Sequence, residues 1–455
     1  MRRPPTRKAL IVAALLLAAL ALRVAEIERT TYHPVVDAGS YLKLASEIAH
    51  IGDYSNSHAP QSGAGGTRGP SAYFPPGYPY FLAAVDLIDG HPTPRDGAVQ
   101  PARYSQAVLG TVTVGLVGLV ALEAFGETVG LIALALAAVY PVLIELSGTL
   151  VAENLLTALV LAATWAALRA GRSSHAYRWI ATAGVLTGLS ILAHINGVVL
   201  LLPLGVAAWR ARPTILAPGL LLVTALLTVA PWTIRNAVVL HRFVPVTDET
   251  GITLVGTYNP ASASNHRVPY KWRIYSRLPG ERSLVRQARN LTEPELSSRL
   301  QSQALHYIGD HPLAPFAVIY HNTLRMLELE GSFAWRASAA AIDLSAQTAE
   351  IGVIGFWVLC ALALTGAFTA AARAAPRWIW AVPLLFWLSV AIVNVETPRF
   401  REPIDPFLIL LAACALAAAL TSARTRLTRA PVRGEAGTAV TARPAQLVEV
   451  VERLA

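Results

Sequence analysis

The stretch HPVVDAGSY, residues 33–41, follows the first apolar segment, residues 9–25, at the point where the chain would leave a membrane. After Asp37, apolar residues repeat with the period of an α-helix, and the charged residues fall on its other faces. These apolar residues are Tyr41, Leu44, Ala45 and Ile48. The pattern predicts an amphipathic helix that lies along the membrane surface with an acid at its N-terminus. The local sequence leaves open that Asp37 only caps this helix by accepting backbone N–H bonds.

The composition is that of a polytopic membrane protein. Hydrophobic residues make up 54% of the 455 residues and charged residues 14%, whereas about a quarter of a soluble protein is charged. The basic residues stand mostly at the ends of apolar segments, where membrane orientation requires them, so nucleic acid is not an expected partner. Cys360 and Cys414 both lie in apolar segments, which excludes a disulfide framework and a thiolate metal site.

About ten segments are apolar enough to span a bilayer as α-helices, which takes about 20 residues each. They are residues 9–25, 104–125, 128–146, 153–168, 179–194, 197–209, 214–232, 350–372, 378–395 and 403–421. The first segment has no small-residue cleavage site after it, so we expect it to be retained as a helix. The predicted fold class is an all-α polytopic membrane protein.

Arginines flank these segments in a pattern that predicts their orientation. With the N-terminus inside, they all fall on the inner side if residues 27–102 lie wholly outside. These arginines are Arg169, Arg172, Arg178, Arg210, Arg212, Arg373, Arg377, Arg424 and Arg426. Residues 77–88 (GYPYFLAAVDLI) are too few to span, and we expect them to form a short re-entrant or surface helix.

This topology divides the chain into six parts. They are a cytoplasmic N-terminus with the first transmembrane helix (1–26), a first outer loop with juxtamembrane helices and Asp37 (27–102), transmembrane helices two to seven (103–235), a large outer loop (236–348), transmembrane helices eight to ten (349–421) and a cytoplasmic, disordered tail (422–455). Loops as long as the two outer ones, without the composition of disorder, usually carry function.

Polar side chains gather at the outward ends of five separate segments. They are Asp37, Glu153, His194, Asn196, Arg235, Asn236, Glu396, Arg399, Arg401 and Glu402. Ionisable residues at membrane depth are costly and tend to mark substrate or ion pathways, although each of these could also be a solvated or snorkelling interfacial residue. Carboxylates can take a proton from a hydroxyl or hold a divalent metal, and arginines can clamp a phosphate. The set suits group transfer from a lipid phosphate, or transport of an anionic lipid or solute.

Four motifs, in this order, resemble those of the GT-C glycosyltransferases, in particular the group of protein mannosyltransferases and aminoarabinose transferases. The motifs are DAGSY (37–41) with IAHIGDY (48–54) and PPGYP (75–79); SGTLVAENL (147–155); PWTIRN (231–236) with FVP (243–245) and GTYNP (256–260); and RFREPIDPF (399–407). The chain departs from the pattern at Phe74, where aminoarabinose-type enzymes often carry a lysine.

The resemblance implies a GT-C-type helical bundle, a polyprenyl-phosphate sugar as donor, and a lipid, glycan or protein hydroxyl as acceptor. The reaction would take place on the extracytoplasmic face of a membrane, which the Ala/Arg/Pro bias suggests is a bacterial plasma membrane. Asp37 would be the general base and Glu153 would assist it. The lipid phosphate would be bound by Arg235, Arg399, Arg401 and Tyr78. Candidate contacts to the acceptor or to a metal are His58, His194 and His266. The metal is unknown, and a divalent ion is the one cofactor that these residues leave open.

Two other classes of function stay open. A transporter or flippase of lipid-linked or anionic solutes would predict broken helices and mid-membrane acids in related halves, whereas these acids cluster at the outer ends. A non-catalytic scaffold that binds lipid would tolerate Asp37→Asn and Glu153→Gln, and a transferase would not. The sequence does not identify the sugar or the acceptor.

Overall fold

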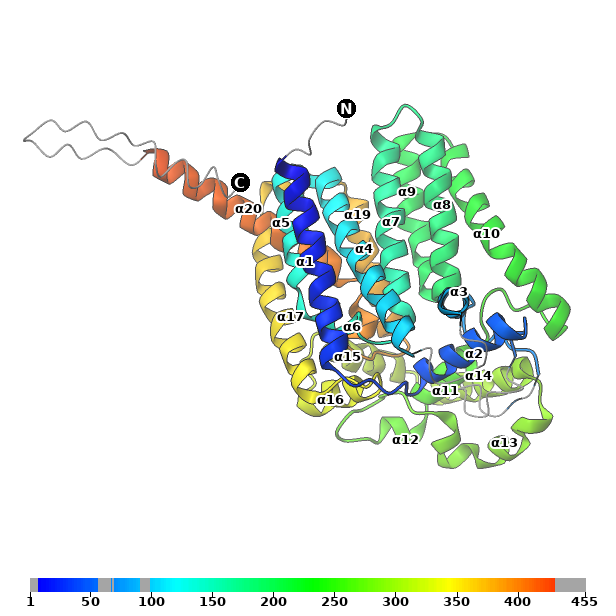
Figure 1. The fold of residues 1–455 in the computed structure, drawn as a ribbon. Helices are drawn as coiled ribbons and strands as arrows, with labels where there is room; N and C mark the ends of the chain where they lie inside the picture. Colours follow the sequence, from blue (N-terminus) through cyan, green and yellow to red (C-terminus); the bar gives the residue numbers. More distant parts are fainter. Residues whose placement is uncertain (1–6, 56–66, 68, 91–98, 430–455) are drawn as a thin grey trace, which may run out of the picture. The chain divides into compact units, whose positions relative to one another are not determined.

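The computed structural model describes residues 7–55, 67, 69–90 and 99–429. The chain divides into two compact units, Met1–Ala417 and Ala418–Ala455. Of the second unit, the structure describes residues 418–429, which continue the last helix; all that follows concerns the first unit. Within the described residues, the regular structure is helical, and one isolated β-bridge joins Ser55 to Pro70 (Figure 1).

Seven helices among the described residues are long and apolar enough to cross a membrane. They are α1 (Arg7–Arg29), α4 (Val99–Phe125), α7 (Ala152–Arg172), α8 (Ala176–Ala193), α10 (Leu216–Leu240), α17 (Ala346–Ala367) and α20 (Asp405–Arg429). Three shorter apolar elements accompany them: α5 (Glu127–Val139), the 3-10 segment η2 (Ile195–Leu200) with α9 (Leu201–Ala211), and α19 (Arg377–Ala391). The predicted class, an all-α polytopic membrane protein with about ten spans, is confirmed.

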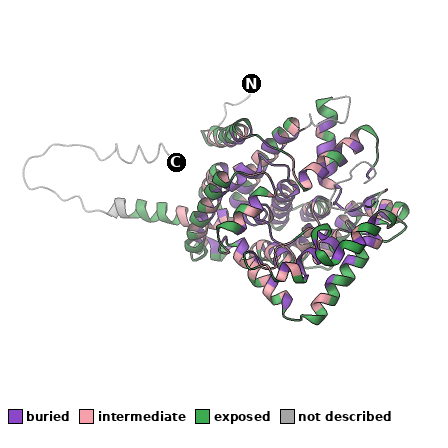
Figure 2. Cartoon of the chain, turned by 90° about the horizontal axis from the view of Figure 1, so that it is seen from below, coloured by how far each residue is buried: buried purple, intermediate pink, exposed green. Residues whose placement is uncertain are grey.

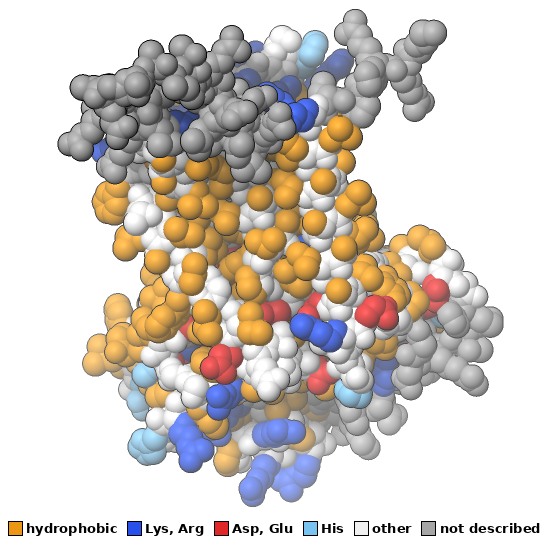
Figure 3. Space-filling view, turned by 60° about the vertical axis from the view of Figure 1, so that its left-hand side comes forward, with side chains coloured by type: hydrophobic (Ala, Val, Ile, Leu, Met, Phe, Trp, Pro, Cys, Tyr) orange, Lys and Arg blue, Asp and Glu red, His pale blue; other side chains and the backbone are white. Residues whose placement is uncertain are grey.

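The sides of the bundle present apolar side chains outward, as contact with lipid tails requires. On the face seen in Figure 3, hydrophobic side chains form a band, and acidic and basic side chains gather below it. On α10, Leu226 is 57% exposed and Leu227 is 66% exposed. A helix of a soluble protein would not carry such a surface, so the chain is an integral membrane protein.

Buried residues lie on the inner faces of the helices (Figure 2), and polar residues of the spans are among them. Arg23 of α1 is fully buried, and its Nε donates a hydrogen bond to Ser147 Oγ at 3.2 Å. Asn154 Nδ2 of α7 donates to Gln106 Oε1 of α4 at 2.9 Å. Lipid offers such groups no partners, so these bonds join α1 to the turn at Ser147 and α7 to α4 inside the bundle.

Several predicted span boundaries differ from the helix bounds, most of all in the segments 128–146 and 214–232. The segment 128–146 is two helices, because α5 ends at Val139 and α6 (Pro141–Leu146) begins at the proline. The residue before a proline avoids the helical conformation, and Tyr140 is accordingly extended. Conversely, α10 does not end at residue 232 but continues through Pro231 to Leu240.

The two long segments between spans cover the same end of the bundle (Figure 1). The first holds α2 (Asp37–His50) and α3 (Gly77–Asp89). The second holds α11 (Thr250–Thr257), α12 (Pro260–Ala263), α13 (Arg282–Gln287), α14 (Glu293–Asp310), α15 (Ala314–Met326) and α16 (Ser332–Ala340). They share one hydrophobic cluster, to which Tyr41 of α2, Ile252 of α11 and Leu296 of α14 belong. The short helix predicted at 77–88 is α3.

Arginines from the predicted inner side lie at the opposite end. Arg169 and Arg172, in the last turn of α7, face Glu123 near the end of α4, with N–O distances of 3.4 and 2.8 Å. The bundle therefore separates this basic end from the end that carries Asp37. Which end faces the cytoplasm stays a prediction.

Candidate functional site

Asp37 begins α2 but does not cap it. The N-cap is Val36, whose φ of 50° is strained for a β-branched residue, and no side chain makes a cap hydrogen bond there. Asp37 Oδ2 instead accepts a hydrogen bond from Arg399 Nη1 at 2.7 Å. The carboxylate therefore serves a tertiary contact, and the capping alternative does not hold. Backbone strain of this kind is typical of functional sites.

Arg399 is the centre of a buried ionic cluster. Its Nη2 donates to Glu396 Oε2 at 2.8 Å, and its Nε lies 3.9 Å from Glu153 Oε1. Burial opposes the charge of Arg399, but Glu396, Asp37 and Glu153 outweigh it and raise the pKa of the guanidinium well above its ordinary value. Arg399 is thus a permanent cation that orients Asp37 and Glu396 and lies beside Glu153.

These residues come from distant parts of the sequence. Arg399 lies on the 3-10 turn η6 (Arg399–Arg401) between α19 and α20, and Glu153 lies in the first turn of α7. The positive end of the α7 dipole favours a carboxylate at that place. The predicted residues Asp37, Glu153 and Arg399 are therefore brought together by the fold.

Lys271 joins the cluster from the second long segment. Its Nζ donates to Ser338 Oγ at 3.0 Å and lies 3.9 Å from Glu396 Oε1. Burial lowers the pKa of Lys271. Burial alone would raise the pKa of Glu396, but Arg399 and Lys271 together bring it below the ordinary value. Glu396 thus bridges the two cations.

Glu249 adds a carboxyl group of a different kind. It stands directly before α11 and lines the same cavity as Asp37. Burial, and then the charge of Asp37, raise the pKa of Glu249 to about 8. Glu249 is therefore protonated at neutral pH, while Glu396 is ionised.

A cavity of about 700 Å³ opens over this cluster. Its charged lining residues are Asp37, Glu153, Glu249, Lys271, Arg273, Arg277, Glu396 and Arg399. Its aromatic lining residues are Tyr41, Tyr73, Phe74, Trp272 and Phe400. The volume lies within the range of small-molecule sites. Charges of both signs beside aromatic walls suit a ligand with an anionic part and an apolar part.

Two predicted phosphate contacts do not line this cavity. Tyr78 is fully buried, with its ring edge-on to Tyr41 at 4.9 Å between centroids. Arg235 donates from Nη1 to Ser71 O at 2.6 Å and from Nη2 to Tyr54 O at 2.8 Å. Arg235 therefore fastens the first long segment to α10.

Arg401 also lies apart from the cavity, in a buried ion-pair group of its own. Its Nη1 donates to Glu328 Oε1 at 2.8 Å, and its Nε lies 3.2 Å from Asp405 Oδ1. The Arg401 side chain is 2% exposed. Breaking a buried pair of this kind usually destabilises the fold, so these contacts indicate a structural role.

The three candidate histidines differ in position. His194 lines the cavity, its Nδ1 accepts a hydrogen bond from Asn196 N at 3.3 Å, and its ring lies edge-on to Phe400. His266 is exposed on the chain after α12 and does not line the cavity. His58 lies outside the described residues. Within the described part of the chain, no group of three His, Cys, Asp or Glu side chains could hold a metal, so we assign no metal ligand.

Glu249 and Lys271 were not predicted from the sequence. Both come from a long segment of mixed charge, in which a single acid or lysine has no periodic pattern to distinguish it. Proximity to Asp37 distinguishes them, and only the folded chain provides it.

The comparisons with known proteins agree with this fold. Residues 74–234 match the family model described as dolichyl-phosphate-mannose-protein mannosyltransferase. No curated protein matches the chain. The apo oligosaccharyltransferase of Archaeoglobus fulgidus is similar in structure, with a TM-score of 0.55 and 12% identity over 94% of this chain and 52% of that one. The same organism's oligosaccharyltransferase AglB, in complex with an inhibitory peptide and a dolichol-phosphate, gives a TM-score of 0.50 and 14% identity over 98% and 53%.

A third similar structure is ArnT of Cupriavidus metallidurans bound to undecaprenyl phosphate, with a TM-score of 0.38 and 16% identity over 93% of this chain and 81% of that one. The chain spans about half the length of the archaeal proteins. At these identities the likeness to the two archaeal structures shows the fold alone, and it agrees with the GT-C fold that the motifs predicted.

Proposed function

We propose that this chain, a membrane protein with the GT-C fold, is a glycosyltransferase that moves a sugar from a polyprenyl phosphate to a hydroxyl group. The observation that carries the proposal is the contact of Asp37 with Arg399, beside Glu153, in a cavity of about 700 Å³. The match to a mannosyltransferase family model supports it. The dolichol-phosphate in the complex of the similar archaeal protein supports a lipid phosphate as the donor.

In the proposed reaction, an oxygen of the Asp37 carboxylate takes the proton of the acceptor hydroxyl. The acceptor oxygen bonds to the anomeric carbon of the sugar as the bond from that carbon to the phosphate oxygen breaks. The electron pair leaves on the lipid phosphate. Arg399 acts by orienting Asp37, and Glu153 contributes to the same array. An ion pair fixes the direction of a carboxylate better than a hydrated surface does.

The leaving phosphate needs cations that are not already occupied. Arg273 and Arg277 line the cavity and make no ion pair with any residue that the structure describes. Lys271 lines the same cavity but is engaged with Ser338 and Glu396. We therefore assign the phosphate to Arg273 and Arg277, and we assign Arg235 and Arg401 to the support of the fold.

We propose that the reaction takes place on the extracytoplasmic face of the membrane. This placement rests on the arginine pattern, because Arg169 and Arg172 lie at the end of the bundle opposite Asp37. The sugar is a hexose or a pentose, which a panel of donors distinguishes. The acceptor is a hydroxyl of a lipid, a glycan or a protein, which a panel of acceptors distinguishes.

The first test is release of sugar from polyprenyl-phosphate donors by the full chain in nanodiscs. We expect wild type to consume at least one donor, and Asp37→Asn to bind that donor with similar affinity while turning it over at least about 100-fold more slowly. Asp310→Asn, which changes an exposed acid on α14, is the matched control and should keep the wild-type rate.

Equal turnover by Asp37→Asn and wild type would contradict the assignment of Asp37. Donor binding without consumption by wild type, together with movement of the donor lipid across the bilayer, would favour the transport alternative instead. Tolerance of Glu153→Gln as well as Asp37→Asn would favour a lipid-binding scaffold.

A further inference from the structure

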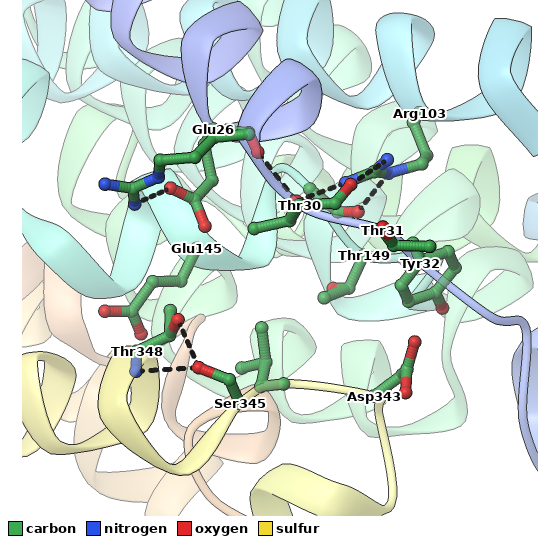
Figure 4. Close-up of a pocket in the computed structure, with 13 residues that line it drawn as sticks. Glu26, Thr30, Thr31, Tyr32, Arg103, Glu145, Thr149, Asp343, Ser345 and Thr348 are labelled. Atoms are coloured by element: carbon green, nitrogen blue, oxygen red, sulfur yellow. Dashed lines mark hydrogen bonds and ion pairs between the residues drawn. The ribbon is translucent and has the colours of Figure 1, made fainter.

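A second cavity, of about 390 Å³, lies at the end of α1, and no described residue lines both it and the larger cavity. Figure 4 shows its walls, which come from α1, α4, the end of α6 and the start of α17. Its hydroxyl-bearing residues are Thr30, Thr31, Tyr32, Thr149, Ser345 and Thr348. Its charged residues are Glu26, Arg29, Arg103, Glu145 and Asp343. A cavity with polar walls holds water or a polar ligand, unlike an apolar packing defect.

Both arginines of this cavity are already engaged by the protein. Arg103 donates from Nε to Gly148 O at 2.8 Å and from Nη2 to Thr30 Oγ1 at 2.7 Å. Arg29 Nη2 lies 2.5 Å from Glu26 Oε2. An anionic ligand would therefore find occupied cations and uncompensated carboxylates, which disfavours it.

Glu145 is the group that lacks a partner. Its residue is 4% exposed, and its Oε2 accepts no hydrogen bond from any residue that the structure describes. A Cβ added at Gly352 of α17 would lie 2.6 Å from this oxygen, so the glycine makes room for the carboxylate. A buried carboxyl oxygen without donors is costly. Glu145 also lines the cavity, so a hydroxyl-bearing ligand there would meet its carboxyl group.

We propose that this cavity is a second binding site, for a small neutral polyhydroxylated molecule of the size of one sugar ring. Carboxylates accept hydrogen bonds from hydroxyl groups, and the lining hydroxyls both donate and accept. The volume lies within the range of small-molecule sites. A metal ion does not fit, because the described residues provide no group of three ligating side chains.

The position of the site ties it to the segment that carries Asp37. The chain passes from Tyr32, in the second cavity, to Asp37, in the first. Between them, His33 N donates a hydrogen bond to Asp343 Oδ2, which lines the second cavity. A ligand that contacts Asp343 therefore acts on the connection between α1 and α2. Binding at this site does not require that the chain transfer sugar.

The test is a titration of the full chain in nanodiscs with methyl glycosides of common hexoses and pentoses, followed by saturation-transfer NMR. At least one glycoside should bind, and Glu145→Gln should weaken binding about tenfold or more, since the amide places an N–H donor where the carboxyl group offers an acceptor oxygen. Gly352→Ala, which displaces the carboxylate, should do the same. Asp310→Asn changes an exposed acid on α14 that lines neither cavity, and it should keep the wild-type affinity.

Thr31→Val tests the same cavity with a change that should leave the fold intact, because Thr31 is exposed on the chain after α1 and lines the cavity. It should weaken binding several-fold at an unchanged thermal midpoint. The proposal is overturned if no glycoside binds, if a small ammonium compound alone binds, or if Asp37→Asn abolishes binding while Glu145→Gln does not. Glycoside binding by a chain that consumes no donor would refute the transferase and leave this site standing.

Discussion

At the residue scale, the site depends on how its charges are distributed. Arg399 lies against Asp37 and Glu396 with two different nitrogens, which a lysine could not reproduce. Glu249 stands out because it shares the cavity but contacts none of these nitrogens. It is the acid there whose charge changes near neutral pH.

This position of Glu249 predicts a pH dependence of donor binding. Below its pKa of about 8, Glu249 is neutral. As pH rises through this value it gains a negative charge beside Asp37 and repels a phosphate in the cavity. We expect donor affinity to fall about tenfold, or roughly 1.4 kcal/mol, above that pH. Glu249→Gln should remove the fall and Asp310→Asn should preserve it, as measured by donor binding across the pH range. The same fall in Glu249→Gln would exclude Glu249 as its cause.

At the scale of elements, the two long segments are joined by buried polar contacts as well as by apolar packing. Glu293, at the start of α14, accepts from Ala72 N at 2.6 Å and from Ser71 Oγ at 2.8 Å. Asp248 N donates to Ala72 O at 3.1 Å. Both sets of contacts hold residues 71–72 of the first segment against the second.

The acid at this junction predicts how stability varies with pH. Burial, and then the charge of Glu293, raise the pKa of Asp248 well above its ordinary value. The folded state therefore keeps a proton that the unfolded state loses. The stabilisation is complete below the ordinary carboxyl pKa and is lost as the pH rises from that pKa through the raised one. Thermal midpoints in nanodiscs should fall from about pH 5 to about pH 9 in wild type, and much less in Asp248→Asn. Equal slopes for both proteins would contradict this account.

The PPGYP motif has its explanation at the same scale. A Cβ at Gly77 would lie 2.8 Å from backbone atoms of Leu192 and Ala193, so α3 packs directly on the end of α8. The glycine is required by this close approach rather than by its backbone angles.

At the scale of the whole molecule, the helical bundle has one end with basic residues and an opposite end that carries the cavities. Single cysteines should distinguish the two ends in intact cells, after Cys360 and Cys414 are replaced by alanine. His266→Cys, in the second long segment, should react with a membrane-impermeant maleimide added outside. Arg212→Cys, at the end of α9, should react only after permeabilisation. The reverse pattern would place the Asp37 cavity on the cytoplasmic side.

The sequence by itself determined the all-helical, polytopic character of the chain, the short helix α3 and the amphipathic helix α2. These features follow from hydropathy and helical period, which are local properties of neighbouring residues. Tertiary structure decided which charges meet. In the folded chain Arg399 contacts Asp37, and Glu249 and Lys271 line the same cavity. Arg235 and Arg401 make structural contacts instead. These ion pairs join residues that lie far apart in the chain, so a local sequence pattern cannot predict which charged residues will pair.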